Sequence, residues 1–168
     1  LQRMKVADVG DVPMQSRYSL EQCHSDIEDY VSRIVRAGAI PIGVGGDHSI
    51  TQAILKAVGR ERPVGLLHID AHCDTGDDYL GSKFHHGAPF SRAVEEGLLD
   101  PKRVIQIGIR GSINHKDMWK FSHDSGMRVV YMEELHDKGW RWAADEARKV
   151  VGTGKTYLSF DIDSLDPV

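Results

Sequence analysis

Residues 64–74 read Val64-Gly65-Leu66-Leu67-His68-Ile69-Asp70-Ala71-His72-Cys73-Asp74. The first six residues are almost continuously apolar, which is typical of a strand that is covered on both faces of a parallel sheet. Side chains that can bind metal ions follow at once, at the carboxyl end of the strand, where open α/β sheets place their ligands. This segment therefore predicts both a buried parallel sheet and a polar site at its edge.

The rest of the chain repeats this pattern of short apolar runs and amphipathic segments. Further strands are predicted at Lys5–Val9, Ile40–Val44, Val104–Ile109, Arg128–Tyr131 and Thr156–Phe160. Helices are predicted at Leu20–Ala37, Ile50–Val58, Ala88–Glu96, Lys116–Asp124 and Arg141–Val151. Because strands alternate with helices, right-handed crossovers are expected to build an α/β fold with a mainly parallel sheet and helices on both faces.

The first predicted helix carries signals at both of its ends. Ser19 and Gln22 have the spacing of a capping box, in which the two side chains satisfy backbone N–H groups of the first turn. Gly38 fits the position just after the last turn, where a left-handed backbone conformation is common. These signals bound the helix independently of its apolar stripe.

The composition indicates an ordinary globular domain. The chain has 168 residues, of which 40% are hydrophobic and 27% charged, with 21 Lys and Arg against 25 Asp and Glu. This balance argues against a disordered chain, and the lack of a basic excess argues against a nucleic-acid partner. No apolar run approaches the roughly 20 residues of a membrane span, and the start does not resemble a signal peptide. With two Cys a reducing compartment is expected, and the nine His raise the question of metal binding.

Three segments concentrate the side chains that can bind metal, and each lies at the carboxyl end of a predicted strand. They are Gly45–Ser49, His68–Asp74 and Ser159–Pro167. Asp70, His72 and Asp74 are spaced by two, so an extended backbone directs all three to the same side. Asp161 and Asp163 repeat this spacing on another strand. The ends of neighbouring parallel strands are expected to bring these groups together.

Imidazoles with several carboxylates form a hard donor set that suits Mn²⁺, with Mg²⁺, Ni²⁺, Co²⁺ and Zn²⁺ less favoured. Six such side chains exceed the needs of one ion, and two ions about 3.5–4 Å apart can share bridging carboxylates. Taken alone, a His-x-Asp pair is more typical of a solvated loop, and Asp70 or Asp161 can simply cap a turn. Carboxylates at several strand ends would repel one another, however, so their coincidence favours cations between them.

These motifs resemble the signatures of the ureohydrolase family. The matching residues are Gly45-Gly46-Asp47-His48-Ser49, Asp70-Ala71-His72-x-Asp74 and Ser159-x-Asp161-x-Asp163-x-x-Asp166-Pro167. The family includes arginase, agmatinase, guanidinobutyrase, guanidinopropionase and formiminoglutamase. The resemblance extends along essentially the whole chain and is greatest to the agmatinase branch, as at His86-Gly87-Ala88-Pro89-Phe90. It implies a three-layer α/β/α sandwich of the arginase type, in which residues 1–168 form a single partial domain, incomplete at both ends.

The resemblance also implies the metal ligands. It assigns one Mn²⁺ to His48, Asp70, Asp74 and Asp161. It assigns a second Mn²⁺ to His72, Asp70, Asp161 and Asp163, so that two of the carboxylates bridge the ions. Two cations lower the pKa of a water molecule between them, which then attacks the guanidinium carbon of the substrate.

The resemblance implies an acid/base residue as well. His86 matches the family's acid/base or substrate-contacting His, and it would protonate the leaving amine. Its neighbour His85 is expected to be an exposed loop residue. Asp47 is expected to orient His48 or to bind backbone.

Four more side chains near the motifs are given other interpretations. Asp166 is expected to shape the turn after Asp163, and Cys73 to alternate away from the ligands. Asp77 and Asp78 can attract a cationic substrate, although a solvated loop is the alternative.

The function implied is that of a dinuclear manganese amidinohydrolase that converts agmatine to putrescine and urea. Within the family, a guanidinobutyrase, a guanidinopropionase or another guanidino-acid hydrolase is the alternative. A different alternative is a non-catalytic segment, and residues 1–168 alone are expected to be nearly inactive, because the family's guanidinium-binding Glu falls beyond Val168. The expected partners are a small cationic guanidino substrate and further copies in a trimer or hexamer, without nucleic acid or membrane. The expected compartment is the cytoplasm, or the mitochondrion in a eukaryote.

Overall fold

A four-stranded parallel sheet forms the centre of the molecule. The structure is a computed structural model that describes residues 5–111 and 117–166. Its strands are β1 (Val64–Ile69), β2 (Leu99–Ile109), β3 (Arg128–Tyr131) and β4 (Thr156–Phe160), in the order β3-β2-β1-β4. All neighbours in this order pair in parallel, as the alternation of strands and helices predicts.

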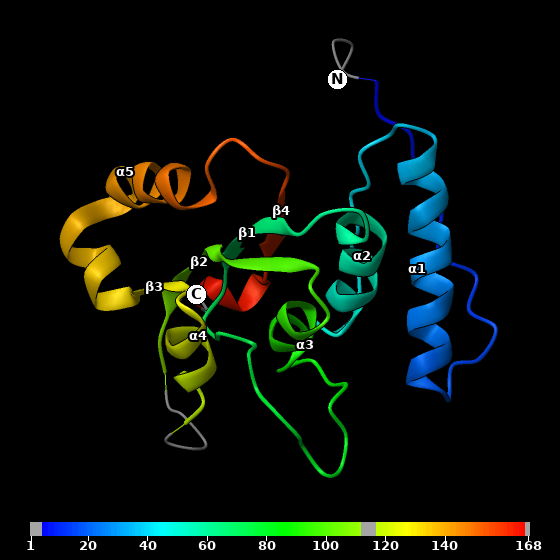
Figure 1. The fold of residues 1–168 in the computed structure, drawn as a ribbon, viewed down its shortest axis with the longest axis horizontal. Coiled ribbons are helices and arrows are strands. Elements are labelled where there is room, and N and C mark those ends of the chain that lie inside the picture. Colours follow the sequence, from blue (N-terminus) through cyan, green and yellow to red (C-terminus); the bar gives the residue numbers. More distant parts are fainter. Residues whose placement is uncertain (1–4, 112–116, 167–168) are drawn as a thin grey trace.

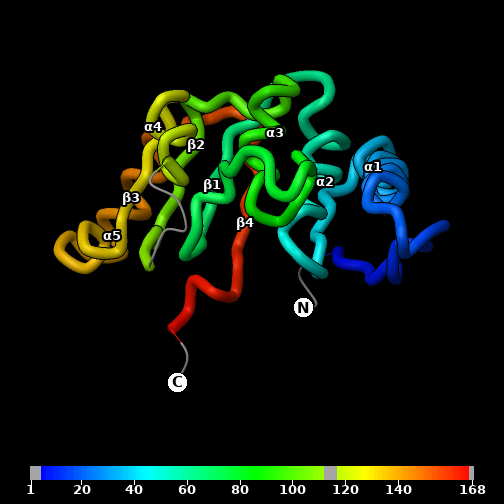
Figure 2. Tube along the Cα trace, turned by 90° about the horizontal axis from the view of Figure 1, so that it is seen from below, coloured from blue at the N-terminus to red at the C-terminus, as the bar shows by residue number. Residues whose placement is uncertain are grey.

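Helices cover both faces of this sheet (Figures 1 and 2). On one face, α2 (Ile50–Gly59) and α3 (Pro89–Glu95) pack on β1 and β2 around the buried side chains of Leu55, Leu66 and Phe90. On the other face, α5 (Met132–Val151) buries Ala143 and Ala147 against β2 and β3. The α/β/α arrangement with a parallel sheet is therefore confirmed.

The two remaining helices lie at the flanks. The first, α1 (Leu20–Arg36), packs on the outer side of α2 through Ile27 and Val31, and α4 (Lys120–Ser125) packs against β2 and β3. The cap signals of α1 are largely confirmed, because Ser19 Oγ accepts the Gln22 N–H at 3.2 Å and Gly38 has φ +76°. The Gln22 side chain instead donates to Asp26, so the reciprocal half of the capping box does not form.

Two predicted strands are wrong. Residues 5–9 and 40–44 are extended or irregular, and neither has a ladder partner among residues 5–111 and 117–166. Ile40, Ile42 and Val44 are 89%, 81% and 96% exposed, so the apolar pattern that indicated a strand here is not buried. A strand exists only where a neighbour supplies its hydrogen bonds, and apolar composition alone cannot show that the neighbour is present.

Several element boundaries also differ from the prediction. Strand β2 begins at Leu99 rather than Val104, because Leu99 still pairs with Val64 across a register shift. Helix α5 begins at Met132 rather than Arg141, and Gly139, with φ 80° and ψ 163°, kinks it in between. The polar first half of α5 has no continuous apolar stripe, which is why its periodicity did not indicate a helix. The remaining helices agree with the prediction to within a few residues, and the start of the predicted helix at Lys116 lies outside the described residues.

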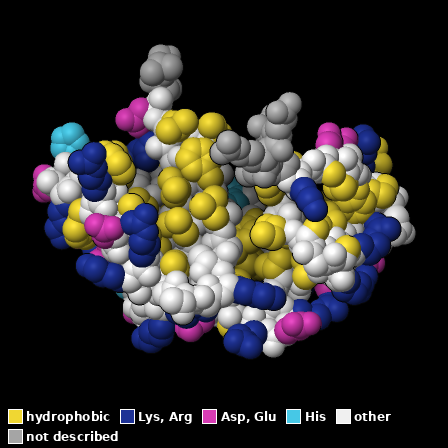
Figure 3. All heavy atoms as spheres, turned by 90° about the horizontal axis from the view of Figure 1, so that it is seen from above, with side chains coloured by type: hydrophobic (Ala, Val, Ile, Leu, Met, Phe, Trp, Pro, Cys, Tyr) yellow, Lys and Arg dark blue, Asp and Glu magenta, His cyan; other side chains and the backbone are white. Residues whose placement is uncertain are grey.

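Apolar side chains remain exposed along the β4 edge of the sheet. Leu158, Phe160 and Ile162 are 59%, 51% and 72% exposed. Figure 3 shows that hydrophobic side chains gather on one side of the molecule. Of the helices in the described part of the chain, none has the length and apolar character needed to cross a bilayer.

Candidate metal centre

The carboxyl ends of β1 and β4 position the two carboxylates on which the site is built. Ile69 pairs with Phe160, so Asp70 and Asp161, the next residues of the two strands, lie side by side. The Asp161 N–H also donates to the Ile69 carbonyl at 2.9 Å, which continues the ladder up to the site. The parallel register therefore brings together two groups that are 91 positions apart in the chain.

His48 reaches the same place from the turn before α2. Residues 45–49 do not follow a strand, contrary to the prediction, but the turn still directs His48 at the ends of β1 and β4. Asp47 accepts the Ser49 N–H at 2.8 Å, which supports its expected role of binding backbone in this turn. His48 Nε2 lies 2.7 Å from Ser159 Oγ, and this contact orients the ring.

The Nδ1 atom of His48 lies among three carboxylates. Its distances to Asp70 Oδ2, Asp74 Oδ2 and Asp161 Oδ2 are 3.3, 2.8 and 3.4 Å. The atom is buried and has no hydrogen-bond partner, so none of these contacts has hydrogen-bond geometry. An imidazole nitrogen that faces three oxygens in this way matches what a divalent cation needs from its ligands.

A second group of the same kind adjoins the first. His72 Nδ1 lies 3.5 Å from Asp70 Oδ1 and 3.0 Å from Asp163 Oδ2. The other oxygen of Asp163 accepts the Ala71 N–H at 3.2 Å, and Asp161 Oδ1 accepts the Asp163 N–H at 3.0 Å. These bonds hold the short 3₁₀ turn at Ile162–Ser164 against the end of β1.

Asp70 belongs to both groups, with a different oxygen in each. Its Oδ2 faces His48, while its Oδ1 faces His72 and accepts the His72 N–H at 2.6 Å. The carboxylate is 1% exposed and has little freedom to rotate. The structure thus brings the six predicted ligands into two adjacent clusters that share Asp70.

Asp74 completes the first cluster through an unusual backbone conformation. Its φ is +49°, one of only two positive values among the described non-glycine residues. Asp tolerates this left-handed region better than most residues, and such conformations concentrate at functional sites. The turn directs the Asp74 carboxylate back at His48, and its carbonyl accepts the Phe90 N–H at 3.2 Å.

Charges in the cluster shift the pKa values of its members. Burial acts to lower the pKa of His48, but the Asp70 and Asp74 carboxylates outweigh it and raise the pKa to about 10. Burial acts to raise the pKa of Asp70, but the His48 and His68 imidazoles outweigh it and lower the pKa below its usual value. Burial and the charges of Asp70 and Asp161 raise the pKa of Asp163. The metal-free site therefore retains a proton on His48 and has an excess of negative charge.

The affinity for Mn²⁺ is expected to rise with pH because of His48. With a pKa of about 10, the metal-free imidazole is protonated on both nitrogens at neutral pH. One of these protons must leave before the ring can bind a cation. The apparent affinity of the cluster that contains His48 should then increase about tenfold per pH unit below that pKa, with one proton released by His48 when this cluster binds its ion. Calorimetric titrations with Mn²⁺ between about pH 6 and 9, in buffers of different ionisation enthalpy, measure both quantities. An affinity that does not change with pH in the intact protein, or that changes equally in His48→Gln, contradicts this.

A cavity of about 190 Å³ opens beside the two clusters. Its walls are formed by His72, Cys73, Asp74, Thr75, Gly76, His86, Gly87, Arg110, Met118 and Trp119. His86 is exposed, and within the described residues its ring makes no hydrogen bond. His85 has both ring nitrogens engaged, Nε2 with the Asp77 carbonyl at 2.8 Å and Nδ1 with the Gly87 N–H at 3.2 Å. The ring that is available to a ligand is therefore that of His86, and His85 braces its loop.

Some acidic and thiol groups near the motifs are held outside the clusters. Cys73 is buried against Ile109 and Val129, and burial raises its pKa to about 12. Asp77 pairs with Arg92 at 3.1 Å, and Asp78 accepts the Gly81 N–H at 2.8 Å within its own turn. Both carboxylates of the Asp77-Asp78 loop are therefore already engaged in ion pairs or hydrogen bonds.

Two residues of the site were given no role by the sequence. Arg110 follows β2, and its Nη2 donates to the Asp163 and Ser164 carbonyls and to Asp166 Oδ1 at 3.0–3.1 Å, so it clamps the turn that carries Asp163. His68 lies in β1 with its ring against Asp70. The only available signal for His68 was its spacing of two before Asp70, which places both on the same side of the strand.

Comparison with known proteins agrees with this geometry. The model of the arginase family matches residues 1–168. A guanidinopropionase from Pseudomonas aeruginosa is 48% identical over 98% of this chain and 52% of its own length. A mitochondrial agmatinase from Gallus gallus is 50% identical over 96% of this chain and 48% of its own length. The chain spans about half the length of these relatives.

Solved structures share the fold as well. A formiminoglutamase variant from Trypanosoma cruzi, determined with Mn²⁺, matches with a TM-score of 0.83 and 28% identity. The match covers 95% of this chain and 53% of that one.

Proposed function

The chain belongs to the arginase family, and we propose that the protein hydrolyses the guanidinium group of a small linear substrate to release urea. The observation that carries the proposal is the sharing of Asp70 between two clusters of imidazole and carboxylate groups. Hydrolysis of a guanidinium needs an activated nucleophile. The Ser159 hydroxyl lies 2.7 Å from His48 Nε2, but Ser159 is only 6% exposed and is not among the described residues that line the cavity, so an activated water molecule is the better candidate. The site as described favours a metal-assisted reaction.

The donors present fit two manganese ions. His48, Asp70, Asp74 and Asp161 would hold one ion, and His72, Asp70, Asp161 and Asp163 would hold the other. The fit rests on the buried His48 Nδ1, which faces carboxylates without hydrogen-bonding to them. When bound, two such cations supply Lewis-acid chemistry that activates a water molecule near neutral pH.

The side chains around the cavity would perform the remaining steps. Water adds to the guanidinium carbon, the bond from this carbon to the alkylated nitrogen breaks, and that nitrogen must gain a proton to leave as an amine. His86 lines the cavity and its ring makes no hydrogen bond to the described residues, so it can donate this proton. Arg110 would keep Asp163 in position by binding the carbonyls of its turn.

Agmatine is the substrate we favour, because the described residues that line the cavity offer no spare cation for an acid. Arg110 is the one Lys or Arg among the described residues that line it, and its Nη2 is already occupied by three oxygens. A substrate carboxylate would need such a partner, whereas an ammonium group can contact the Trp119 ring, which lines the cavity. The loop that carries Asp77 and Asp78 attracts a cationic substrate less strongly than the sequence indicated, because Asp77 is paired with Arg92. A guanidino acid is the second candidate, because the relative that is 48% identical is a guanidinopropionase.

A substrate panel tests the proposal. The intact protein, loaded with Mn²⁺, is assayed for urea with agmatine, 4-guanidinobutyrate, 3-guanidinopropionate and arginine. The expected result is the highest kcat/KM for agmatine, with activity lost on chelation and restored by Mn²⁺. Urea from an acid but not from agmatine would replace the first candidate by the second. Binding of Mn²⁺ without urea from any of the four would indicate a non-catalytic member of the family.

A further inference from the structure

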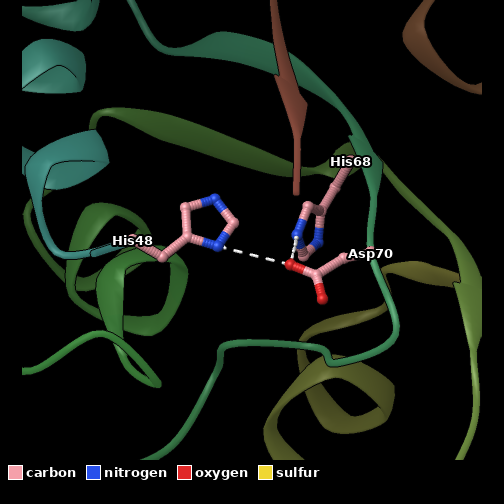
Figure 4. A group of neighbouring side chains, drawn as sticks. All are labelled: His48, His68 and Asp70. Carbon is pink, nitrogen blue, oxygen red and sulfur yellow. Dashed lines mark hydrogen bonds and ion pairs between the residues drawn. The ribbon is translucent and has the colours of Figure 1, made fainter. Parts of the chain in front are cut away.

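A fully buried histidine lies against the carboxylate shared by the two clusters. His68 is 0% exposed, and its Nε2 lies 2.7 Å from Asp70 Oδ2. Figure 4 shows that His48 and His68 point at this same oxygen from two different directions. By position alone His68 could be either a metal ligand or a support for Asp70. The hydrogen bonds behind its ring distinguish the two roles.

The amide of Gln106 determines where the His68 proton lies. Gln106 Oε1 accepts from Ser122 Oγ at 2.8 Å, and Gln106 Nε2 donates to the Cys73 carbonyl at 2.5 Å. Because a carbonyl can only accept, the nitrogen of this amide must be the atom that faces Cys73. Its second hydrogen then faces His68 Nδ1 at 3.1 Å. The amide orientation thus follows from the Cys73 carbonyl.

Because the Gln106 amide donates a hydrogen bond to Nδ1, only one tautomer of His68 is possible. Nδ1 must accept, so the ring proton is on Nε2 and is donated to Asp70 Oδ2. Both ring nitrogens are then used, and no lone pair remains for a cation. His48 is the opposite case, because its Nδ1 has no hydrogen-bond partner.

The chain of hydrogen bonds continues away from the site. Ser122 donates its one hydrogen to Gln106, so Thr75 must donate to Ser122 Oγ, at 2.9 Å. Thr75 and Ser122 are 3% and 0% exposed, and Gln106 is 0% exposed. The ring of Phe90 lies 4.4 Å from that of His68 and restricts its rotation. Three side chains, Gln106, Ser122 and Thr75, thus fix the position of the proton on His68.

We propose that His68 is a positioning residue, which donates to Asp70 through a proton order set by Gln106, Ser122 and Thr75 and does not itself bind metal. The inference rests on the proposed metal centre. With Oδ2 held by His68 and Oδ1 by the His72 N–H, the Asp70 carboxylate keeps one oxygen facing each cluster. Loss of an outer hydrogen bond of this kind typically lowers metal affinity by about 10–100-fold.

Two variants of His68 and one of Gln106 test the proposal in the intact protein. His68→Leu removes the donor to Asp70 while keeping an apolar volume, and it is expected to weaken Mn²⁺ binding by about 10–100-fold. His68→Gln can place an amide N–H near the former Nε2, and it should restore most of the affinity. Gln106→Glu cannot donate to His68 Nδ1, so it should disturb the ring tautomer and weaken binding as His68→Leu does.

The readouts separate positioning from mere structural support. The dissociation constant and the number of Mn²⁺ ions bound are measured by electron paramagnetic resonance, and the tautomer of His68 by ¹⁵N NMR of the metal-free protein. Gln52→Met is the matched control, because Gln52 is 1% exposed and, within the part of the chain that the structure describes, its side chain hydrogen-bonds to Glu96 alone, outside the site. It should bind Mn²⁺ as the unmodified protein does.

The outcomes separate this inference from the proposed function. If the unmodified protein neither binds Mn²⁺ nor releases urea, both proposals fail. If it does both, unchanged affinity in His68→Leu overturns the positioning role. A fall from two bound ions to one in both His68 variants would instead make His68 a ligand. The tautomer of His68 tests the proposal even if a variant does not fold, because it is measured on the unmodified protein. A proton on Nδ1 of His68 contradicts the proposal.

Discussion

Asp161→Asn is expected to abolish both Mn²⁺ binding by the two clusters and the release of urea. The carboxylate lies next to Asp70 at the end of the sheet, with Oδ2 3.4 Å from His48 Nδ1. An Asn can keep the hydrogen bond that Oδ1 accepts from the Asp163 N–H at 3.0 Å, so the turn should remain folded. The substitution removes the negative charge and one ligand oxygen. Because metal-assisted activation contributes several kcal/mol, the loss in kcat/KM should be about 10³-fold or more.

Metal analysis of the purified variant and a urea assay measure the two effects side by side. Asp145→Asn is the matched control, since it removes the same charge from an exposed residue of α5 that pairs with Arg148 and belongs to neither cluster. This control should retain its Mn²⁺ and most of its activity. Unchanged turnover in an Asp161→Asn protein that holds no metal would refute the metal-assisted mechanism.

His86→Ala is expected to retain both metal ions and to lower kcat by about 10²–10⁴-fold. His86 lines the cavity beside the clusters but contributes to neither of them. Removing it should therefore leave metal affinity unchanged and slow the protonation of the leaving amine. Steady-state kinetics with agmatine, together with the pH profile of kcat, measure the effect, because loss of an acid/base residue removes one limb of the profile.

The matched control for this prediction is His136→Ala, an exposed histidine on α5 that lies outside the cavity. It should leave both kcat and the pH profile unchanged. If His86→Ala raised KM alone, with kcat intact, the residue would be a substrate contact and the proton would have to come from another group.

Most of the fold could be predicted from local patterns. The strands β1, β3 and β4 and the helix α1 follow directly from apolar runs, amphipathic spacing and caps. Residues 40–44 have the same apolar character but form no strand, because strand formation also requires a neighbour that local sequence does not describe. The first half of α5 shows the converse, since a mainly exposed helix need not have an apolar stripe.

The sequence by itself determined the chemistry of this site: its donor types, their spacing by two, and their location after apolar segments of the chain. Only the tertiary structure decided how the donors meet. The contact of His48 with Ser159 joins residues 111 positions apart, and the pairing of Ile69 with Phe160 aligns Asp70 with Asp161. The role of His68 likewise depends on Gln106 and on residues beyond it. Such contacts are set by the packing of all three layers at once, whereas spacing along the chain reports only which way a side chain points.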